Sequence, residues 1–317
     1  MYQNAKLSLS SLIVLLLTAC GDSSSDSGSA LMTLNITDAP VDDAEAVVVQ
    51  FTSVELKASG EDDSFFEFDD PKTIDLLQLQ GSNSQALLEN VEIPAGDYTQ
   101  IRLGVNAELD EVMDSYIDID EGGPEPVRYE LYIPSGAQTG LKLNTPFTIA
   151  EGSEGIEVAD DDAIYTIDFD LRKSVTDPQG SAGYKLRPSL RLIQNIETGS
   201  IAGTVDVNLL DGVGGETCSD VSELTTGNAV YLFEGANIVP DDIDDMDAEP
   251  LTTALVDYNS DNDTYNYEFG YIAEGDYTIA LTCSADLETE ADDAGVEFTV
   301  SENITVVADE ETEHPFD

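Results

Sequence analysis

Most of the chain alternates apolar and polar side chains with a period of two residues, which is the pattern of half-buried β-strands. The clearest runs lie at 47–51, 101–105 and 167–171, and turn residues separate them from further short runs. Only residues 73–90 have a pattern that could hold a helical turn or two. So many short strands with so few helical windows predict an all-β fold of two antiparallel β-sandwich domains, Ig-like or prealbumin-like.

The charged residues divide the chain into two parts. There are 66 acidic residues and 11 basic ones, which gives a net charge of -55. Apart from Lys6, every Lys and Arg lies between Lys57 and Arg191, and none follows. A chain of 317 residues is long enough for about two domains. We therefore predict one module over 31–196, a second over 197–310, and an acidic tail at 311–317.

The excess of negative charge excludes one class of partner. Binding to nucleic acid depends on clustered Lys and Arg that neutralise phosphates, and this chain has few of either. We expect no nucleic-acid partner. The acidity is better explained by solubility and adaptation to a salty medium than by a functional acidic patch.

The N-terminal stretch has the composition of a signal peptide, because Lys6 precedes an apolar run, Leu12 to Leu17, that is too short to span a bilayer. Leu-Thr-Ala-Cys at 17–20 resembles the bacterial lipobox. This resemblance implies a signal peptide at 1–19, cleavage between Ala19 and Cys20, and a lipid, including palmitate, on Cys20. Residues 20–30 would then form a lipidated, Ser- and Gly-rich flexible linker.

The anchor also predicts a location. A lipid on Cys20 would attach the protein to a membrane of the cell envelope. Gly21, rather than Asp, follows the cysteine, which by resemblance to known sorting rules favours the outer membrane. The periplasmic and the surface face both remain open.

Five ordered segments carry a resemblance to a known family. They resemble the domain of unknown function 4382 family, whose members are typically bacterial lipoproteins, and the resemblance implies a β-sandwich but no activity. The segments are LNITDAPVDDAEAVVVQFTSVEL (34–56), IPAGDYTQIRLGV (93–105), IPSGAQTGLKL (133–143), FDLRKSV (169–175) and LRPSLRLI (186–193). In the second module, SIAGTV (200–205) and EGDYTIAL (274–281) resemble the non-catalytic carboxypeptidase-regulatory or prealbumin-like sandwich.

The cysteines predict a disulfide. If Cys20 carries a lipid, Cys218 and Cys283 remain, and both would lie on the oxidising side of the inner membrane. We expect them to form a disulfide. The alternative is a thiol nucleophile, which needs a nearby base, and the chain has a single histidine, His314, close to its end.

Catalytic residue types are scarce. With one histidine, only carboxylates remain in number, and among 66 of them no pair stands out. We predict a non-enzymatic envelope lipoprotein with a structural or adhesion role, whose partner is an envelope protein or a glycan. The alternative is a ligand-binding surface module, glycan-binding or calcium-assisted, and a carboxylate-based hydrolase is the weakest hypothesis.

One acidic segment suggests a metal site. Asp257, Asn259, Asp261 and Asp263, followed by Glu268, have the spacing of oxygen ligands in an EF-hand loop. The alternation after Asp263 instead predicts a strand, which would carry Glu268 about 16 Å away. We reject the EF-hand. What remains is a hairpin tip in which Asp257, Asn259, Asp261 and Asp263 are a candidate calcium site, with a plain solvated turn as the alternative. No other cofactor is expected.

Overall fold

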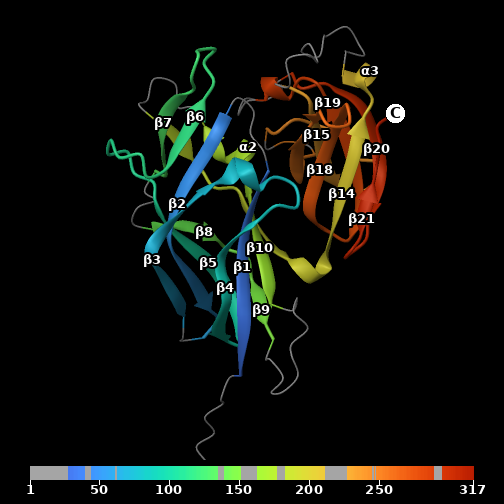
Figure 1. Cartoon of the computed structure of the whole chain (residues 1–317). Coiled ribbons are helices and arrows are strands. Elements are labelled where there is room, and N and C mark those ends of the chain that lie inside the picture. The colour runs from blue at the N-terminus through green and yellow to red at the C-terminus, as the bar shows by residue number, and fades with distance from the viewer. Residues whose placement is uncertain are drawn as a thin grey trace, which may run out of the picture.

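The computed structural model describes residues 28–39, 44–60, 63–134, 139–150, 163–176, 183–210, 227–244, 246, 248–288 and 295–317. Strands dominate these residues and form two bodies that lie side by side (Figure 1). The body at the blue to green end of the chain is the first module, strands β1 to β13. The body at the yellow to red end is the second module, strands β14 to β21. The prediction of an all-β fold with two sandwiches is confirmed.

The first module has two sheets. One has the strand order β13-β10-β1-β4, and the other has the order β11-β12-β7-β6-β2-β5-β8, with β3 paired to β2 and β9 paired to β5. Three short helices, η1 (Leu76–Leu79), α2 (Leu171–Ser174) and η2 (Asn195–Glu197), connect or follow these strands. The strands are β1 (Ser29–Ala39), β2 (Ala44–Ala58), β3 (Ser64–Asp75), β4 (Gln85–Pro94), β5 (Gly96–Asn106), β6 (Tyr116–Ile119), β7 (Val127–Tyr132), β8 (Leu141–Leu143), β9 (Phe147–Ile149), β10 (Ile164–Asp170), β11 (Val175–Thr176), β12 (Gly183–Leu186) and β13 (Leu190–Gln194).

The second module has two four-stranded sheets, ordered β17-β18-β14-β21 and β16-β15-β19-β20. Helices α3 (Val207–Leu210) and η4 (Ala285–Leu287) lie between strands. The strands are β14 (Thr198–Val205), β15 (Ala229–Glu234), β16 (Thr252–Leu255), β17 (Asp257–Asn259), β18 (Thr264–Ala273), β19 (Gly275–Thr282), β20 (Phe298–Val306) and β21 (Glu311–Glu313).

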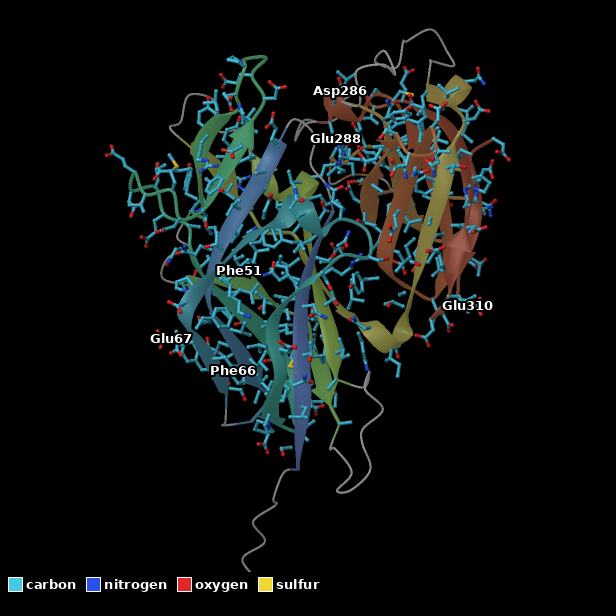
Figure 2. All side chains as sticks on the ribbon, viewed as in Figure 1. Phe51, Phe66, Glu67, Asp286, Glu288 and Glu310 are labelled. Atoms are coloured by element: carbon cyan, nitrogen blue, oxygen red, sulfur yellow. The ribbon has the colours of Figure 1, made fainter. Side chains whose placement is uncertain are left out.

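The alternating apolar side chains fill the space between the sheets of each module. In the first module Leu34 of β1, Phe51 of β2 and Leu103 of β5 are fully buried in one cluster, and Phe51 lies within that body in Figure 2. In the second module Ile201 of β14 and Ile279 of β19 belong to a separate cluster. The two clusters are separate, so each module has a core of its own. Burial of each such side chain stabilises the fold by about 1.5–3 kcal/mol.

Two details of the fold differ from the sequence-based expectation. Residues 311–317 are not a tail, because Glu311–Glu313 pairs in parallel with β14 and Phe316 is 1% exposed in the core. The burial of Phe316 outweighs the acidity of its neighbours. The sheets are also not wholly antiparallel, since β1 pairs with β10, β7 with β12 and β14 with β21 in parallel. Within 73–90 the helical turn is η1, and β3 and β4 occupy both ends.

The two modules share a tyrosine-containing corner. Tyr98 follows Gly96 at the start of β5, and its hydroxyl donates to the Pro94 carbonyl at 2.7 Å. Tyr277 occupies the same place in β19 and donates to the Ala273 carbonyl at 2.8 Å. Each bond reaches back four residues and fixes a strand-to-strand corner, as tyrosine corners do in sandwiches. The echoed Gly-Asp-Tyr-Thr sequence is therefore architectural.

None of the helices in the described part of the chain has the length and apolarity needed to cross a bilayer.

Candidate functional site between the two modules

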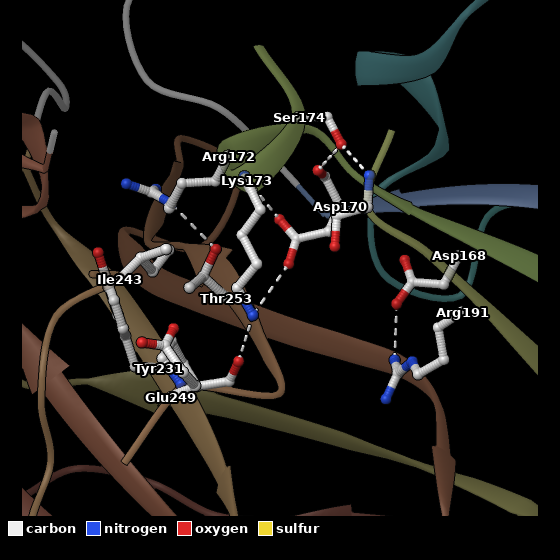
Figure 3. A network of polar contacts seen from close by, with 12 residues as sticks. Asp168, Asp170, Arg172, Lys173, Ser174, Arg191, Tyr231, Ile243, Glu249 and Thr253 are labelled. Atoms are coloured by element: carbon white, nitrogen blue, oxygen red, sulfur yellow. Dashed lines mark hydrogen bonds and ion pairs between the residues drawn. The ribbon is translucent and has the colours of Figure 1, made fainter. Parts of the chain in front are cut away.

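A short helical turn after β10 carries the main contact between the modules. The Asp170 carboxylate accepts a hydrogen bond from the Lys173 backbone N–H at 3.1 Å, which caps α2. The Ser174 hydroxyl donates back to the Asp170 carbonyl. This capped turn directs Arg172 and Lys173 toward the second module (Figure 3).

Arg172 is buried at the boundary and is 9% exposed. Its Nε donates to Thr253 Oγ1 at 3.1 Å, its Nη1 donates to the Ala285 carbonyl at 3.3 Å, and its guanidinium lies 5.6 Å from the centre of the Tyr231 ring.

Lys173 Nζ donates to the Pro250 carbonyl. Residues 199–317 contain no Lys or Arg. The first module therefore supplies the positive charges that these carbonyls receive.

A second contact joins the loop after η1 to strand β18. The Ser82 backbone N–H donates to Glu268 Oε1 at 3.0 Å, and the Tyr271 hydroxyl donates to Ser84 Oγ at 2.8 Å. At Gly270 the two backbones approach closely, since a Cβ there would lie 2.3 Å from the Gly81 carbonyl oxygen. Only glycine fits at that position, so the loop is seated directly on the strand.

A cavity of about 310 Å³ is lined by residues of both contacts. The first module contributes Asp38, Asp168 and Arg191, among others, and the second contributes Asp257 and Glu268. A second cavity of similar volume shares Asp168 and Arg191 and is lined also by Asp170, Lys173 and Glu249. The Asp168–Arg191 pair therefore lies where the two cavities adjoin.

Asp38, near the end of β1, is the buried carboxylate of this region that lacks a cation. It is 5% exposed, and neither of its oxygens makes a hydrogen bond of good geometry. Asp168 is paired with Arg191 at 2.6 Å, and Asp170 lies 3.5 Å from Lys173 Nζ. Burial raises the pKa of Asp38 well above its usual value, and the charges of Asp168 and Asp170 raise it further, whereas the Leu171 backbone N–H opposes the shift.

Asp170 has a related but more balanced environment. Burial raises the pKa of its carboxyl, and the nearby Lys173 ammonium works against that shift. The capping hydrogen bond from the Lys173 backbone N–H also favours the charged form. A nearby cation and the capping hydrogen bond therefore offset the burial of Asp170, which caps α2, whereas Asp38 forms no ion pair that would offset its burial.

The single histidine lies elsewhere. His314 lines a different cavity, with Nδ1 3.2 Å from the Tyr267 hydroxyl oxygen and Nε2 3.2 Å from a Glu302 carboxylate oxygen. The Tyr267 hydroxyl donates to the His314 carbonyl, and burial raises the pKa of Tyr267 far above its ordinary value. These contacts join β18, β20 and the C-terminal segment, and they do not bring His314 to Asp38.

Two of the predicted functional cysteines, Cys20 and Cys218, lie outside the described residues. Cys283 is described, and its Sγ lies 3.7 Å from the carbonyl oxygens of Leu209 and Leu210 at the end of α3. Cys218 follows Leu210 by eight positions in the sequence. The lipidation of Cys20, the cleavage after Ala19 and the Cys218–Cys283 disulfide remain predictions.

The predicted calcium-binding hairpin forms as a hairpin. Asn259 at the end of β17 pairs with Thr264 at the start of β18. The Tyr258 hydroxyl donates to Asp263 Oδ1 at 2.7 Å, and the Asp261 N–H donates to Asn259 Oδ1 at 3.0 Å. Calcium binding at this tip stays a prediction.

Two acidic residues that belonged to that spacing lie at the module boundary instead. Glu268 leaves the hairpin on strand β18 and contacts Ser82, and Asp257 faces the cavity between the modules. Elsewhere, one group of three acidic ligand atoms within 4.8 Å of one another is found among the described residues. It consists of Asp241, Asp242 and Asp244.

Sequence reasoning missed the residues of this boundary. Asp38 lies in the segment LNITDAP, Arg172 and Lys173 lie in FDLRKSV, and Arg191 lies in LRPSLRLI. All four occur in segments that carry the family resemblance, and three of them are among only 11 basic residues. The rarity of Lys and Arg in so acidic a chain was the signal that could have identified them.

The family described as "Domain of unknown function (DUF4382)" matches residues 29–188, just over half of the chain. The chain therefore belongs to this family. Asp38, Asp168, Arg172 and Lys173 fall within the matched residues, and Arg191 follows them closely. No curated protein matches the chain.

Similarity to solved structures is slight. A leucine-rich repeat protein from Bacteroides thetaiotaomicron is 10% identical with a TM-score of 0.20, and the match covers 90% of this chain but only 26% of that one. A candidate adhesin from Bacteroides ovatus is 10% identical with a TM-score of 0.20, over 90% of this chain and 93% of that one. A candidate polysaccharide-binding protein from Bacteroides thetaiotaomicron is 9% identical with a TM-score of 0.18, over 90% of both chains. TM-scores this low support no conclusion about fold or function.

Replacing Arg172 should loosen the contact between the modules. Arg172→Ala removes the hydrogen bonds to Thr253 and Ala285, and bonds from a charged donor contribute about 1.5–3 kcal/mol each. We expect the wild type to melt in one calorimetric transition and the variant to lose about 3–6 kcal/mol and melt in two. Lys142→Ala removes a positive charge from an exposed position and is the matched control. Identical melting of the two variants would contradict this role.

Replacing Asp38 should stabilise the protein in buffer free of divalent cations. A carboxyl whose pKa is raised by folding keeps its proton better in the folded state than in the unfolded one, where the pKa is about 3.9. Its ionisation therefore lowers stability as pH rises above about 4, by about 1.4 kcal/mol for each pKa unit between the two states. Asp38→Asn stays neutral and should escape this loss.

Denaturation from pH 4 to pH 8 checks this expectation. The stability advantage of Asp38→Asn over the wild type should grow with pH, whereas Asp70→Asn, at an exposed position, should show no such growth. An advantage that is constant with pH, or a wild type that is the more stable at pH 8, would be the contrary result.

Proposed function

We propose that this chain is a non-enzymatic, lipid-anchored protein of the bacterial cell envelope whose two docked sandwiches serve a structural or adhesion role. The observation that carries this proposal is the docking itself. Buried Arg172 and the Ser82–Glu268 contact join the modules at two places, so that they can present their outer loops as one surface. Loops positioned by a rigid β scaffold are the usual carriers of binding in such proteins.

The distribution of charge supports an extended, exposed position. A net charge of -55 would repel an anionic bilayer, so a tethered body would stand away from the membrane that holds its anchor. Glu310 at the far side of the second module and Glu67 in the first lie on opposite flanks in Figure 2. We infer a partner among envelope proteins or glycans, and no nucleic acid.

The anchor and the disulfide complete the proposal. The sequence Leu-Thr-Ala-Cys supports lipidation of Cys20, and Gly21 favours the outer membrane. The position of Cys283 beside Leu209 and Leu210 supports a disulfide with Cys218, because Cys218 follows Leu210 by only eight positions in the sequence. Such a bond would tie α3 to the end of β19.

A ligand-binding module is the second candidate. The observation that favours it is the polar cavity between the modules, where the buried carboxylate of Asp38 makes no hydrogen bond of good geometry. A site with buried polar groups and a volume of about 310 Å³ is at the lower end of the range for small-molecule pockets, about 300–1,000 Å³.

Lipidation is tested by Cys20→Ser. The wild type should partition with membranes and carry acyl mass on Cys20, because two or more acyl chains anchor a protein stably. The variant should keep its signal peptide or appear in soluble fractions. Membrane association of Cys20→Ser together with an unacylated wild type would refute the lipoprotein proposal.

The adhesion role is tested with the chain from Gly21 to Asp317. This protein is used to capture envelope proteins and to probe a glycan array, with Arg172→Ala as the variant whose modules are loosened. A specific envelope protein captured by the wild type and lost by the variant supports the adhesion role. A specific glycan favours the second candidate, and turnover of an ester or glycoside panel would contradict a non-enzymatic function.

A further inference from the structure

We propose that the cavity between the two modules binds a hard divalent cation such as Ca²⁺, with Asp38 as a direct ligand. The site lies between β1, β10 and the η1 loop of the first module and β16 to β18 of the second. It shares Asp257 with the predicted hairpin site but none of the other three residues of that site, Asn259, Asp261 and Asp263. The proposal does not depend on the adhesion role.

The atoms that line the cavity suit a hard cation. Apart from Arg191, its polar side chains carry carboxylate, amide or hydroxyl oxygens, as in Asp38, Gln78 and Thr253; the other lining residues are apolar or glycine, and neither Cys nor His is among them. Ca²⁺ takes six to eight oxygen ligands at about 2.3–2.6 Å, whereas softer metals prefer nitrogen and sulfur. The donor set therefore selects for calcium or magnesium.

The balance of charge also calls for a cation. Four carboxylates line the cavity, those of Asp38, Asp168, Asp257 and Glu268, against the single guanidinium of Arg191, which is bound to Asp168 at 2.6 Å. Both oxygens of Asp38 are buried and make no hydrogen bond of good geometry, although the Leu171 backbone N–H lies close enough to favour the charged form. Buried polar groups are almost always satisfied, because leaving them unpaired costs free energy. A cation coordinated by Asp38 would satisfy this carboxylate.

The geometry sets the mode of binding. Among the described residues, only Asp241, Asp242 and Asp244 bring three acidic ligand atoms within 4.8 Å of one another. The cavity can therefore contribute at most two carboxylates directly, and neutral oxygens and water must complete the shell. A volume of about 310 Å³ leaves room for such water. A site of this kind should bind in the range of extracellular modules, about 0.1–1 mM.

The group at 241–244 is not the site that we propose. Asp241 and Asp242 already interact with other groups, whereas neither carboxylate oxygen of Asp38 makes a hydrogen bond of good geometry. The Asp38 cavity also has walls from both modules, so an ion there would reinforce their docking, and the 241–244 group belongs to the second module alone.

Calcium titration of the chain from Gly21 to Asp317 by calorimetry tests the site, with melting measured in CaCl₂ and in NaCl of equal ionic strength. The wild type should show saturable binding at about 0.1–1 mM and a rise in melting temperature of several degrees. Asp38→Asn should lose at least about tenfold in affinity. This variant is expected to fold, since it removes a buried charge without changing the size of the side chain.

Two further variants separate the rival sites. Asp261→Asn/Asp263→Asn alters the hairpin tip, Asp244→Asn alters the 241–244 group, and both should bind calcium as the wild type does. Loss of binding in either of them with retention in Asp38→Asn would overturn the proposal. Equal melting shifts in CaCl₂ and NaCl would overturn it as well, because the effect would then be ionic screening.

Discussion

The docking of the two modules depends on positively charged side chains of the first module that bind to groups of the second. Residues 199–317 carry 30 acidic side chains and no Lys or Arg, so they cannot neutralise one another. Arg172 and Lys173 supply cations from outside, and they can do so because Asp170 caps the turn that holds them. Glu288 lies close to the module boundary in Figure 2, where the positive charge of Arg172 favours its ionised form. The Tyr231 hydroxyl donates a hydrogen bond to the Glu288 carboxylate. The position of the cavity follows from this arrangement.

The same arrangement explains why Asp38 stands out. Arg191 is bound to Asp168 and Lys173 lies beside Asp170, so no cation is left for the third buried carboxylate. An uncompensated buried acid costs stability, and such residues persist where the structure gains something else from them. Most of the other carboxylates in the described part of the chain are half-buried or exposed, so the cost at Asp38 marks the module boundary as the place where function is to be sought.

The local features of the fold were predictable from the sequence, and the long-range ones were not. The runs at 47–51 and 101–105 fall in β2 and β5, because a period of two is a property of neighbouring residues. The parallel pairing of β14 with β21 brings together segments that are distant in the sequence. The burial of Phe316 could therefore not be predicted from the acidic residues around it. The site was missed for the same reason. Asp38 and Arg191 are 153 positions apart, and only the strand order β13-β10-β1 brings their strands into one sheet.

Small-angle X-ray scattering of the chain from Gly21 to Asp317, at about 0.05 M and 1 M NaCl, tests most directly whether the modules form one docked body. Contacts made by a buried arginine are little affected by salt, although the Debye length falls to about 3 Å at 1 M. The account predicts the same radius of gyration and the same maximum dimension at both concentrations, matching the side-by-side arrangement of Figure 1. A dumbbell-shaped particle, or one that lengthens as the salt changes, would contradict it.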